Sequence, residues 1–437
     1  MKAVILAAGR GVRLQPLTEN RPKQMLPIAG KPLIGHVLDR LRYINLEQVI
    51  IVIGVMGKTI RRYVETLSLP FPVEYVEQLE PKGTGHATAL AAERIKEEPF
   101  LLLYGDVIPS PTLLKKVLKR YEDHNLPLLV VSEVDKLEGF GIVQTSNGLL
   151  NKIIEKPNSL SISGGLVNVG VYVLTPEISN YISEVNISPR GEIELTDALN
   201  VLTERKEVRV VQVLQDEWIH IGYPWDLLKA NKRLLSGLST SSILGRVEEN
   251  VRISGPAVLE KDSLIRTGST IEGPVFICNG AEVGPNAYIR KFTFLDRNVR
   301  VGNACEIKNS IIMEGTRIPH LSYVGDSIIG CNCNLGAGTM VANLRFDEAL
   351  INSTVKGEKI STGERKFGTI IGDEVRTGVN VSLMPGVKIG SYSWIGPGVV
   401  VLKDVPSRVF ITSEQKLKYV ELERPERRGS LIDRDGP

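Results

Sequence analysis

The chain has 437 residues and a formal net charge of +3, and 42% of it is hydrophobic. This length exceeds one ordinary hydrophobic core and predicts two or three domains. The mixed charge argues against nucleic-acid binding, and no apolar run reaches membrane-spanning length. The opening MKAVILAAGRG is typical of a first β-strand rather than a targeting segment, so we expect a cytoplasmic protein.

Residues 1 to about 225 alternate between short apolar runs and amphipathic segments. This alternation predicts an α/β, Rossmann-like domain with a mostly parallel sheet, in which ligands bind at the carboxyl ends of the strands. The expected strands are Ala3–Ala7, Val49–Ile53, Phe100–Leu103, Leu128–Val131 and Val169–Leu174. The expected helices are Ile34–Tyr43, Gly85–Ile95, Pro111–His124 and Leu227–Leu235.

The first expected strand runs straight into a glycine-rich turn, Gly9-Arg10-Gly11, which is followed by Arg13 and Lys23. Glycines permit a tight turn and close approach of the backbone to a phosphate. A lone GxG is more often an ordinary turn, but here it follows a strand and precedes the run LTENRPKQMLPIAGKPLI. The combination favours a phosphate-binding loop.

The run LAAGRGVRLQPLTENRPKQMLPIAGKPL resembles the signature of the sugar-1-phosphate nucleotidylyltransferases. The resemblance implies that Ala8, Gly9 and Gly11 wrap a nucleoside triphosphate, and that Arg13 and Lys23 are catalytic cations. Such cations, with Mg²⁺, would offset the charge that builds on the phosphate oxygens. Val12 departs from the family, whose members usually carry a small hydroxyl residue there.

Further segments of the N-terminal domain match the same family in chain order. Its base-recognition elements match Gln78, Gly83 and Thr84, and Gly105 is another nucleotide-binding position. Its sugar-binding positions match Gly141, Glu155, Lys156 and Asn168.

The resemblance also implies a Mg²⁺ site. Asp106 ends a hydrophobic strand and would be a Mg²⁺ ligand, although without the resemblance we would interpret it as a turn residue. Relatives often place Asp where His220 stands, and a neutral imidazole suits Mg²⁺ poorly. His220 is therefore either the second ligand or a phosphate contact, whereas Asp226 is expected to cap the following helix.

A period of six residues organises the stretch from Val247 to Val401. Aliphatic residues or Met recur at every sixth position from Val247 to Met313, and mostly small residues, such as Cys305, stand four places later. Pro319 interrupts the register, which restarts at Ile329 and again at Ile371. This period predicts a parallel β-helix, which the hexapeptide-repeat proteins form with a left hand and commonly assemble as a trimer.

The interruption of the repeat resembles the acetyltransferase half of bifunctional N-acetylglucosamine-1-phosphate uridylyltransferases. His320 matches the catalytic base of that family, and His is the side chain suited to deprotonate an amine near neutral pH. The implied amino-sugar phosphate site consists of Arg290, Lys308, Tyr323, Asn334, Asn343 and Lys366. The implied acetyl-CoA site consists of Ala337, Val379, Gly396, Pro397 and Lys403.

Two features depart from the bacterial enzyme. The insert Leu344–Arg365 is expected to project as a loop over the acetyltransferase site, and Val379 replaces a hydroxyl residue on the acetyl-CoA face. The layout looks most like the archaeal bifunctional members. The segment Ser413–Arg428 is interpreted as a helix.

The sequence thus predicts four regions and a bifunctional enzyme of nucleotide-sugar synthesis. The regions are a nucleotidylyltransferase domain (1–228), a linker helix (229–245), a left-handed β-helix acetyltransferase domain (246–405) and a tail (406–437). The expected substrates are UTP or dTTP, sugar 1-phosphates and acetyl-CoA, and the expected assembly is a homotrimer. The alternatives are a monofunctional nucleotidylyltransferase with a structural β-helix and a non-catalytic assembly subunit that shares both folds.

Overall fold

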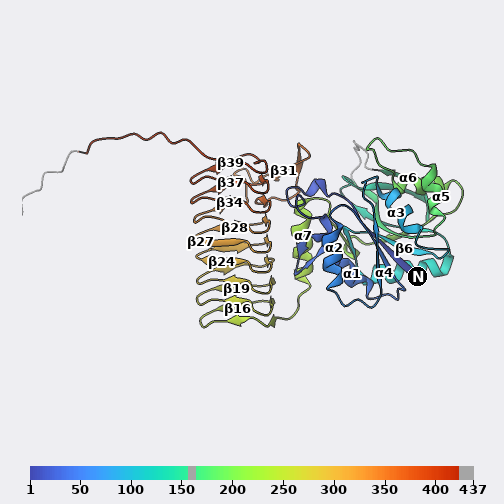
Figure 1. The fold of residues 1–437 in the computed structure, drawn as a ribbon, viewed down its shortest axis with the longest axis horizontal. Coiled ribbons are helices and arrows are strands. Elements are labelled where there is room, and N and C mark those ends of the chain that lie inside the picture. The colour runs from blue at the N-terminus through green and yellow to red at the C-terminus, as the bar shows by residue number, and fades with distance from the viewer. Residues whose placement is uncertain (156–163, 423–437) are drawn as a thin grey trace, which may run out of the picture.

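The structure is a computed structural model that describes residues 1–155 and 164–422 (Figure 1). An α/β domain, here called the head, lies beside a β-helix whose strands stack along one axis. Within the described residues, no helix combines the length and the apolar character needed to cross a bilayer. The helix expected over Ser413–Arg428 is wrong for its described part, because residues 413–422 form no helix.

One nine-stranded sheet forms the centre of the head. Its first four strands are parallel, as predicted, but β11 runs antiparallel to both of its neighbours β6 and β8, so the sheet is mixed beyond β6. The strand order is β5 (Val73–Glu77), β4 (Val49–Ile53), β1 (Lys2–Ala7), β6 (Phe100–Tyr104), β11 (Gly165–Leu174), β8 (Leu128–Val134), β12 (Arg209–Val213), β10 (Leu149–Glu155) and β9 (Gly141–Ser146).

Helices cover both faces of this sheet. Alternate residues of each strand point to opposite faces, so that Ile5 packs in one apolar cluster and Leu6 in the other. One face carries α1 (Leu33–Leu41), α2 (Gly57–Glu65), α4 (Pro111–His124) and α7 (Pro224–Ser236). The other carries α3 (Thr84–Ala92), α5 (Ile178–Glu184) and α6 (Leu195–Thr203).

Short elements complete the head around the first strand and before α7. They are the 3-10 turns η1 (Val12–Leu14), η2 (Lys23–Met25) and η3 (Gln215–Glu217), the strand pair β2 (Pro27–Ile28) and β3 (Lys31–Pro32), and the pair β7 (Val107–Pro109) and β13 (Trp218–His220).

The β-helix has three parallel faces, and each strand pairs with the strand one coil later. The head face, which packs on the head, consists of β14 (Ser242–Ile243), β17 (Ala257–Leu259), β20 (Val275–Ile277), β23 (Phe294–Leu295), β26 (Ile311–Ile312), β29 (Ile328–Ile329), β33 (Ile370–Ile371) and β36 (Lys388–Ile389). The second face consists of β16 (Arg252–Ser254), β19 (Thr270–Glu272), β22 (Tyr288–Ile289), β25 (Glu306–Lys308), β28 (Tyr323–Gly325), β30 (Met340–Val341), β35 (Ser382–Leu383) and β38 (Val400–Val401).

The third face is continued across a single bridging residue. Its first part consists of β15 (Arg246–Val247), β18 (Leu264–Ile265), β21 (Glu282–Val283), β24 (Arg300–Asn303) and β27 (Arg317–His320). Asn334 bridges to β34 (Arg376–Thr377), β37 (Trp394–Ile395) and β39 (Phe410–Ile411).

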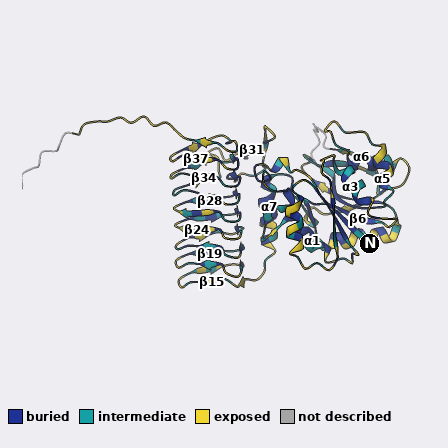
Figure 2. Ribbon diagram, in the orientation of Figure 1, coloured by how far each residue is buried: buried dark blue, intermediate teal, exposed yellow. Residues whose placement is uncertain are grey.

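The six-residue pattern identifies most of the inward positions. The predicted aliphatic residues from Leu259 to Ile307 are buried in one continuous core, and Cys305 and Cys333 fill small inward positions (Figure 2). The interpretation of Met313 as inward is wrong. Ile312 takes that place because one residue is lost from the repeat, and Met313 packs in the cluster that the β-helix shares with the head.

The Leu344–Arg365 insert forms a hairpin, β31 (Asn352–Val355) with β32 (Glu358–Ser361). Its Ile351 and Val355 are buried in the same apolar cluster as the head residues, and Glu364 lies 3.2 Å from Lys229 of α7. The expectation that the insert projects as a loop over the acetyltransferase site is therefore wrong for the hairpin, which packs between the two domains.

A buried histidine makes the stability of the head depend on pH. Nε2 of His36 donates to the carbonyl of Ile28 at 2.8 Å, and burial lowers the pKa of His36 to about 4. As the pH falls from about 6.5 to 4, the unfolded chain takes up this proton before the folded chain does, so stability is lost over that window. We expect a loss of about 2 kcal/mol at pH 5.

The measurement compares thermal unfolding midpoints at pH 7 and pH 5 for the wild type and for His36→Gln. Glutamine retains an amide donor but does not titrate. Equal shifts in the two proteins would show that His36 is not responsible for the pH dependence.

Candidate active sites

The glycine-rich loop of the head brings its two cations to one place. Gly11 has a φ of 66°, and a Cβ built on it would lie 3.1 Å from Cβ of Lys23, so the turn packs against the stem of that lysine. The Arg13 guanidinium lies over the ring of Tyr223, 5.2 Å from its centroid. Gly9 is exposed and has open space where a Cβ would be, whereas Ala8 is half-buried.

Lys23 and Asp106 form a short ion pair, with Nζ of Lys23 2.5 Å from Oδ2 of Asp106. Burial lowers the pKa of the Lys23 amine, and Asp106 opposes that shift. Burial also raises the pKa of Asp106, but the charges of Lys23 and His220 outweigh burial and hold that pKa at about 2. Asp106 is therefore a carboxylate at every physiological pH.

The remaining metal-ligand candidates lie around this pair. Nε2 of His220 is 3.9 Å from Oδ2 of Asp106. Asp226 caps α7 as predicted, because its Oδ2 accepts hydrogen bonds from the backbone N–H groups of Gly222 and Tyr223. No group of three His, Cys, Asp or Glu residues suited to holding a metal ion occurs within residues 1–155 and 164–422. The donor set fits Mg²⁺ held by one carboxylate together with substrate phosphates.

The residues expected to recognise the base also lie together. Gln78 is buried at the end of β5, and its amide nitrogen donates to the carbonyl of Gly83 at 3.0 Å and lies 2.9 Å from Nδ1 of His86. These contacts leave the amide oxygen of Gln78 as the free acceptor. Gly83 needs its φ of 96° to begin α3, and the hydroxyl of Thr84 accepts from the backbone N–H of Leu195.

The expected sugar-binding residues converge from three strands. Gly141 on β9 is the register partner of Glu155 on β10, and a Cβ built on Gly141 would lie 2.8 Å from Oε2 of Glu155 and 3.7 Å from Cβ of Asn168. Asn168 is buried on β11 and donates to the hydroxyl of Tyr172 at 2.6 Å. Lys156 lies outside the described residues.

Arg190 and Glu194 adjoin this cluster, although they are not among the site residues predicted from the sequence. Nη2 of Arg190 lies 2.7 Å from Oε1 of Glu194 and 3.4 Å from Oε1 of Glu155. Glu194 is only 3% exposed and is the N-cap residue of α6. A carboxylate directly before a helix is the available sequence signal, but it is too common to distinguish a site from a cap.

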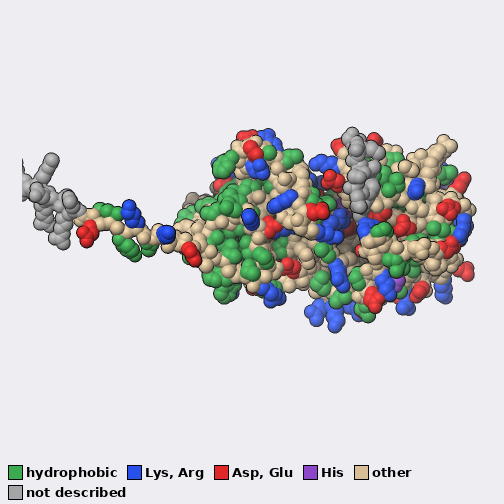
Figure 3. Space-filling view, turned by 90° about the horizontal axis from the view of Figure 1, so that it is seen from above, with side chains coloured by type: hydrophobic (Ala, Val, Ile, Leu, Met, Phe, Trp, Pro, Cys, Tyr) green, Lys and Arg blue, Asp and Glu red, His purple; other side chains and the backbone are tan. Residues whose placement is uncertain are grey.

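A cavity of about 910 Å³ lies beside Arg13 at the junction of the domains. Head residues Arg13, Lys136 and His220 line it on one side, and the insert supplies Ile360, Ser361 and Thr362 on the other. Basic side chains border the hollow between the domains on the face seen in Figure 3. The insert of the β-helix thus forms part of the wall of the cavity beside Arg13.

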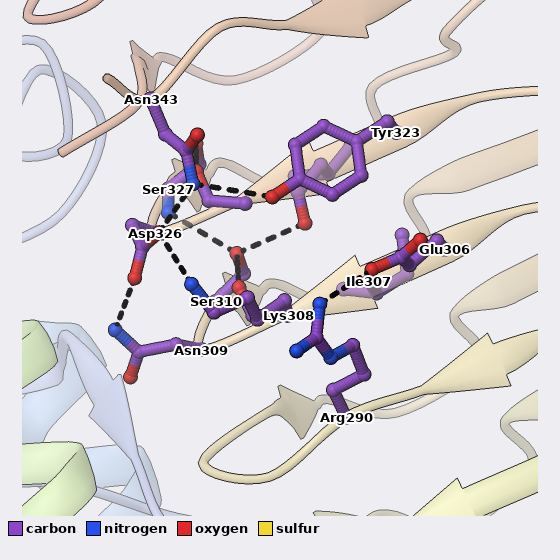
Figure 4. A network of polar contacts seen from close by, with 12 residues as sticks. Arg290, Glu306, Ile307, Lys308, Asn309, Ser310, Tyr323, Asp326, Ser327 and Asn343 are labelled. Carbon is purple, nitrogen blue, oxygen red and sulfur yellow. Dashed lines mark hydrogen bonds and ion pairs between the residues drawn. The ribbon is translucent and has the colours of Figure 1, made fainter. Parts of the chain in front are cut away.

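Three of the amino-sugar candidates, Lys308, Tyr323 and Asn343, lie around one carboxylate, Asp326 (Figure 4). This residue is 4% exposed, and its Oδ2 accepts from Lys308 at 3.3 Å and from Asn343 at 2.5 Å. Nδ2 of Asn343 also lies 3.2 Å from the hydroxyl of Tyr323, and burial raises the pKa of that phenol, which keeps it a hydrogen-bond donor. Asp326 is not among the site residues predicted from the sequence.

Arg290 lies one coil below this cluster, and Lys366 lies beside it. Nη1 of Arg290 is 2.8 Å from Glu306, which is the register partner of Tyr323 (Figure 4). Lys366 forms a β-bridge with Leu344, the residue after Asn343. The end of the insert therefore lies beside Asn343.

His320 stands at the corner between the third and second faces, and the acetyl-CoA candidates stack along the same corner. The N–H of Gly338, beside Ala337, donates to the carbonyl of His320 at 3.4 Å. The carbonyl of Ala337 accepts from Asn380, and the carbonyl of Val379 accepts from Gly398, next to Pro397. The expected base and the expected thioester site therefore adjoin.

Two other acetyltransferase candidates, Asn334 and Gly396, lie near this corner, whereas Lys403 follows β38 of the second face. Asn334 is exposed on the third face, one coil beyond Arg317. Gly396 is buried after β37, and Lys403 is exposed after β38.

These features define a two-domain transferase in which a nucleotidyltransferase fold is joined to a hexapeptide-repeat β-helix. Models of three families match the chain: Nucleotidyl transferase over residues 2–237, GMPPB C-terminal domain over 271–384, and Bacterial transferase hexapeptide (six repeats) over 368–403.

Full-length relatives give the family. A bifunctional sugar-1-phosphate nucleotidylyltransferase/acetyltransferase of Sulfurisphaera tokodaii is 41% identical over 93% of this chain and 98% of its own length. Bifunctional GlmU proteins of Methanococcus vannielii and Methanocaldococcus jannaschii are 43% and 41% identical, over 95% and 97% of this chain and 99% and 100% of their own. The chain belongs to this family of bifunctional nucleotidylyltransferase/acetyltransferases.

Among solved structures, the chain is similar to a UDP-glucose pyrophosphorylase complexed with UDP-glucose. That chain is 26% identical and aligns with a TM-score of 0.49 over 54% of this chain and 98% of its own length.

Replacing Gly141 with alanine tests the sugar-binding cluster. The added Cβ would meet Oε2 of Glu155 at 2.8 Å and displace that carboxylate. We expect the KM for the sugar 1-phosphate in nucleotidylyl transfer to rise about tenfold, because a hydrogen bond to a charged group is lost. The matched control is Gly165→Ala on β11, where a Cβ would meet only Leu137 at 3.5 Å. Equal kinetics for both variants would exclude Gly141 from the sugar site.

Replacing Asp326 with asparagine tests the β-helix cluster. The asparagine amide carries no negative charge. Its contacts with Lys308 and Asn343 are therefore weaker than those of the carboxylate, and the cluster should loosen. We expect the KM for the amino-sugar phosphate in acetylation to rise about tenfold while nucleotidylyl transfer is unchanged. Unchanged acetylation kinetics would contradict the role of this cluster in substrate binding.

Proposed function

We propose that the β-helix N-acetylates an amino-sugar 1-phosphate, glucosamine 1-phosphate or galactosamine 1-phosphate, with acetyl-CoA. We further propose that the head joins the resulting N-acetylhexosamine 1-phosphate, or a hexose 1-phosphate, to UMP or dTMP from UTP or dTTP. The observation that carries this proposal is the presence on one chain of two separate polar clusters. Arg13, Lys23 and Asp106 suit phosphoryl chemistry, and the Asp326 cluster and His320, which lie on either side of β28, suit acyl transfer.

In the head, an oxygen of the sugar phosphate attacks the α-phosphorus of the nucleotide, and the bond to the bridging oxygen breaks as pyrophosphate leaves. Arg13 and Lys23 stabilise the charge on the phosphate oxygens during this transfer. Mg²⁺, when bound at Asp106 and the nucleotide phosphates, would supply further charge neutralisation. His220 lies close enough to Asp106 to orient that carboxylate.

Base selection in the head would rest on Gln78. Its amide nitrogen is already engaged by Gly83 and His86, so its oxygen is available to accept the N3–H of a pyrimidine. Uracil and thymine both carry this donor, which supports the use of UTP and dTTP alike.

In the β-helix, the amine of the sugar attacks the thioester carbonyl carbon of acetyl-CoA. The bond between that carbon and sulfur breaks, and the CoA thiolate leaves. His320 accepts the proton from the amine and returns it to the thiolate, so that CoA thiol is released. Lys308, Tyr323 and Arg290 would hold the phosphate, as cations and a phenol can.

We also propose a homotrimer in the cytoplasm. The described β-helix exposes Trp394, Phe410 and Val400 on its second and third faces, and such apolar side chains favour burial against another copy.

The test is release of CoA thiol from acetyl-CoA with glucosamine 1-phosphate and, in parallel, galactosamine 1-phosphate. Wild type should release thiol with at least one sugar, and His320→Ala should lower kcat by about 10²-fold or more, since a general base contributes that much. Pyrophosphate release by the head should be unchanged. The control is His124→Ala, at the end of α4 in the head.

Two outcomes would contradict the proposal. No thiol release from the wild type would leave a nucleotidylyltransferase with a structural β-helix. No pyrophosphate release from the wild type would favour a non-catalytic assembly subunit. The Arg13→Ala variant would then have no nucleotidylyl-transfer activity to lose.

A further inference from the structure

The segment between Arg13 and Lys23, which belongs to the head, also contacts the β-helix. Residues 15–21 form turns and bends without a helix or strand. Nζ of Lys388 donates to the carbonyl of Gln15 at 2.9 Å. The carboxylate of Glu19 accepts from the backbone N–H of Ser391 at 3.2 Å and from the hydroxyl of Ser407 at 2.7 Å. The loop that carries the two candidate catalytic cations is thus attached to the other domain.

A further attachment is made by Asp373, which lies two residues after β33. Its Oδ2 accepts from Nη2 of Arg21 at 2.8 Å and from Nδ2 of Asn20 at 2.9 Å. The side chains of Arg21 and Asp373 are 15% and 6% exposed, so water screens this ion pair little. Arg21 also lies 3.2 Å from the sulfur of Met313, whose side chain points from the β-helix toward the head.

Hydrogen bonds within the β-helix also hold Asp373 in place. Oδ1 accepts from the backbone N–H of Cys331 at 2.8 Å, and the backbone N–H of Asp373 donates to Ser391 at 3.1 Å. One oxygen is therefore committed to the β-helix and the other to the loop. The carboxylate therefore connects the two domains through hydrogen bonds on both sides.

The position of Arg21 is transmitted to Lys23 over a short and stiff path. Pro22 separates the two residues, is buried and is the N-cap residue of η2. Lys23 is 7% exposed, packs against Gly11 and holds Asp106 at 2.5 Å. A shift of Arg21 would therefore move the Lys23 amine relative to Asp106 and to the α-phosphate.

We propose that Asp373 of the β-helix is a positioning residue for nucleotidylyl transfer in the head, and that it acts through Arg21 on Lys23. The β-helix is then part of the nucleotidylyl-transfer machinery in addition to carrying its own site. This inference rests on the proposed transfer reaction of the head.

The test uses Asp373→Asn in the full chain. Asparagine keeps the volume and an oxygen for Cys331, but it directs an amide toward Arg21 and Asn20. We expect kcat for pyrophosphate release to fall about 10- to 100-fold, as misplacement of a reacting group by about 1 Å can do. KM for the nucleotide should change less than about threefold, because Asp373 does not touch it. Thiol release by the β-helix should keep its wild-type kcat.

The matched control is Glu364→Gln. It removes another ion pair between the domains, Lys229 with Glu364, which is not attached to the loop. This variant should keep both activities within about twofold of the wild type. If loosening of the domain interface alone lowered transfer, Glu364→Gln would lower it too, and the proposal would be wrong.

A double-mutant cycle guards against misfolding of a single variant. Arg21→Ala and Asp373→Ala should each lower kcat of transfer, and the double variant should lose no more than the single variants, because the pair acts as a unit. Additive losses would overturn the proposal. So would a wild-type kcat for Asp373→Asn. Lack of transfer in the wild type would instead refute the proposed function of the head.

Discussion

The protein depends on a hydrophobic contact that belongs equally to both domains. Outward residues of the head face, such as Phe294, Ile311 and Ile370, lie in the same apolar cluster as the residues of α1, α4 and α7. Asn231 of α7 adds a polar tie, since it accepts from the N–H of Ala29 and donates to the carbonyl of Phe292. Helix α7 is therefore packed against both domains. Because the apolar cluster is shared, neither domain can turn relative to the other without exposing it to water.

The two candidate sites have the same electrostatic arrangement on unrelated scaffolds. In each, a mostly buried carboxylate gathers a lysine and further polar side chains: Asp106 with Lys23 and His220, and Asp326 with Lys308 and Asn343. Such a carboxylate orients the cation without neutralising its ability to meet a phosphate, because a second anion can share the remaining N–H groups. Preorganisation of this kind lowers the cost of arranging charges during the reaction.

The sequence predicts what is periodic or local, and this covers most of the fold. The hexads identify the inward residues, and the glycine-rich loop places Arg13 and Lys23 after β1. Three features escaped prediction for physical reasons. The residue lost before Ile312 shifts the register without changing composition, since Met313 is as apolar as its neighbour. Asp326 and Arg190 acquire their meaning from residues distant in sequence. The insert is charged, and its sequence does not show that Ile351 and Val355 are buried against the head.

The contacts between the domains also fix the length of the β-helix. Solenoids usually tolerate gain or loss of a coil, since each coil contacts only its neighbours. Here the head reaches from Phe292, at β23, to Asp373, after β33, and on to Ser407. One extra coil between Phe292 and Asp373 would move the second anchor by about 4.8 Å and break one of the two. The head therefore fixes the number of coils between these anchors, and variation in coil number would be confined to the ends of the β-helix outside them.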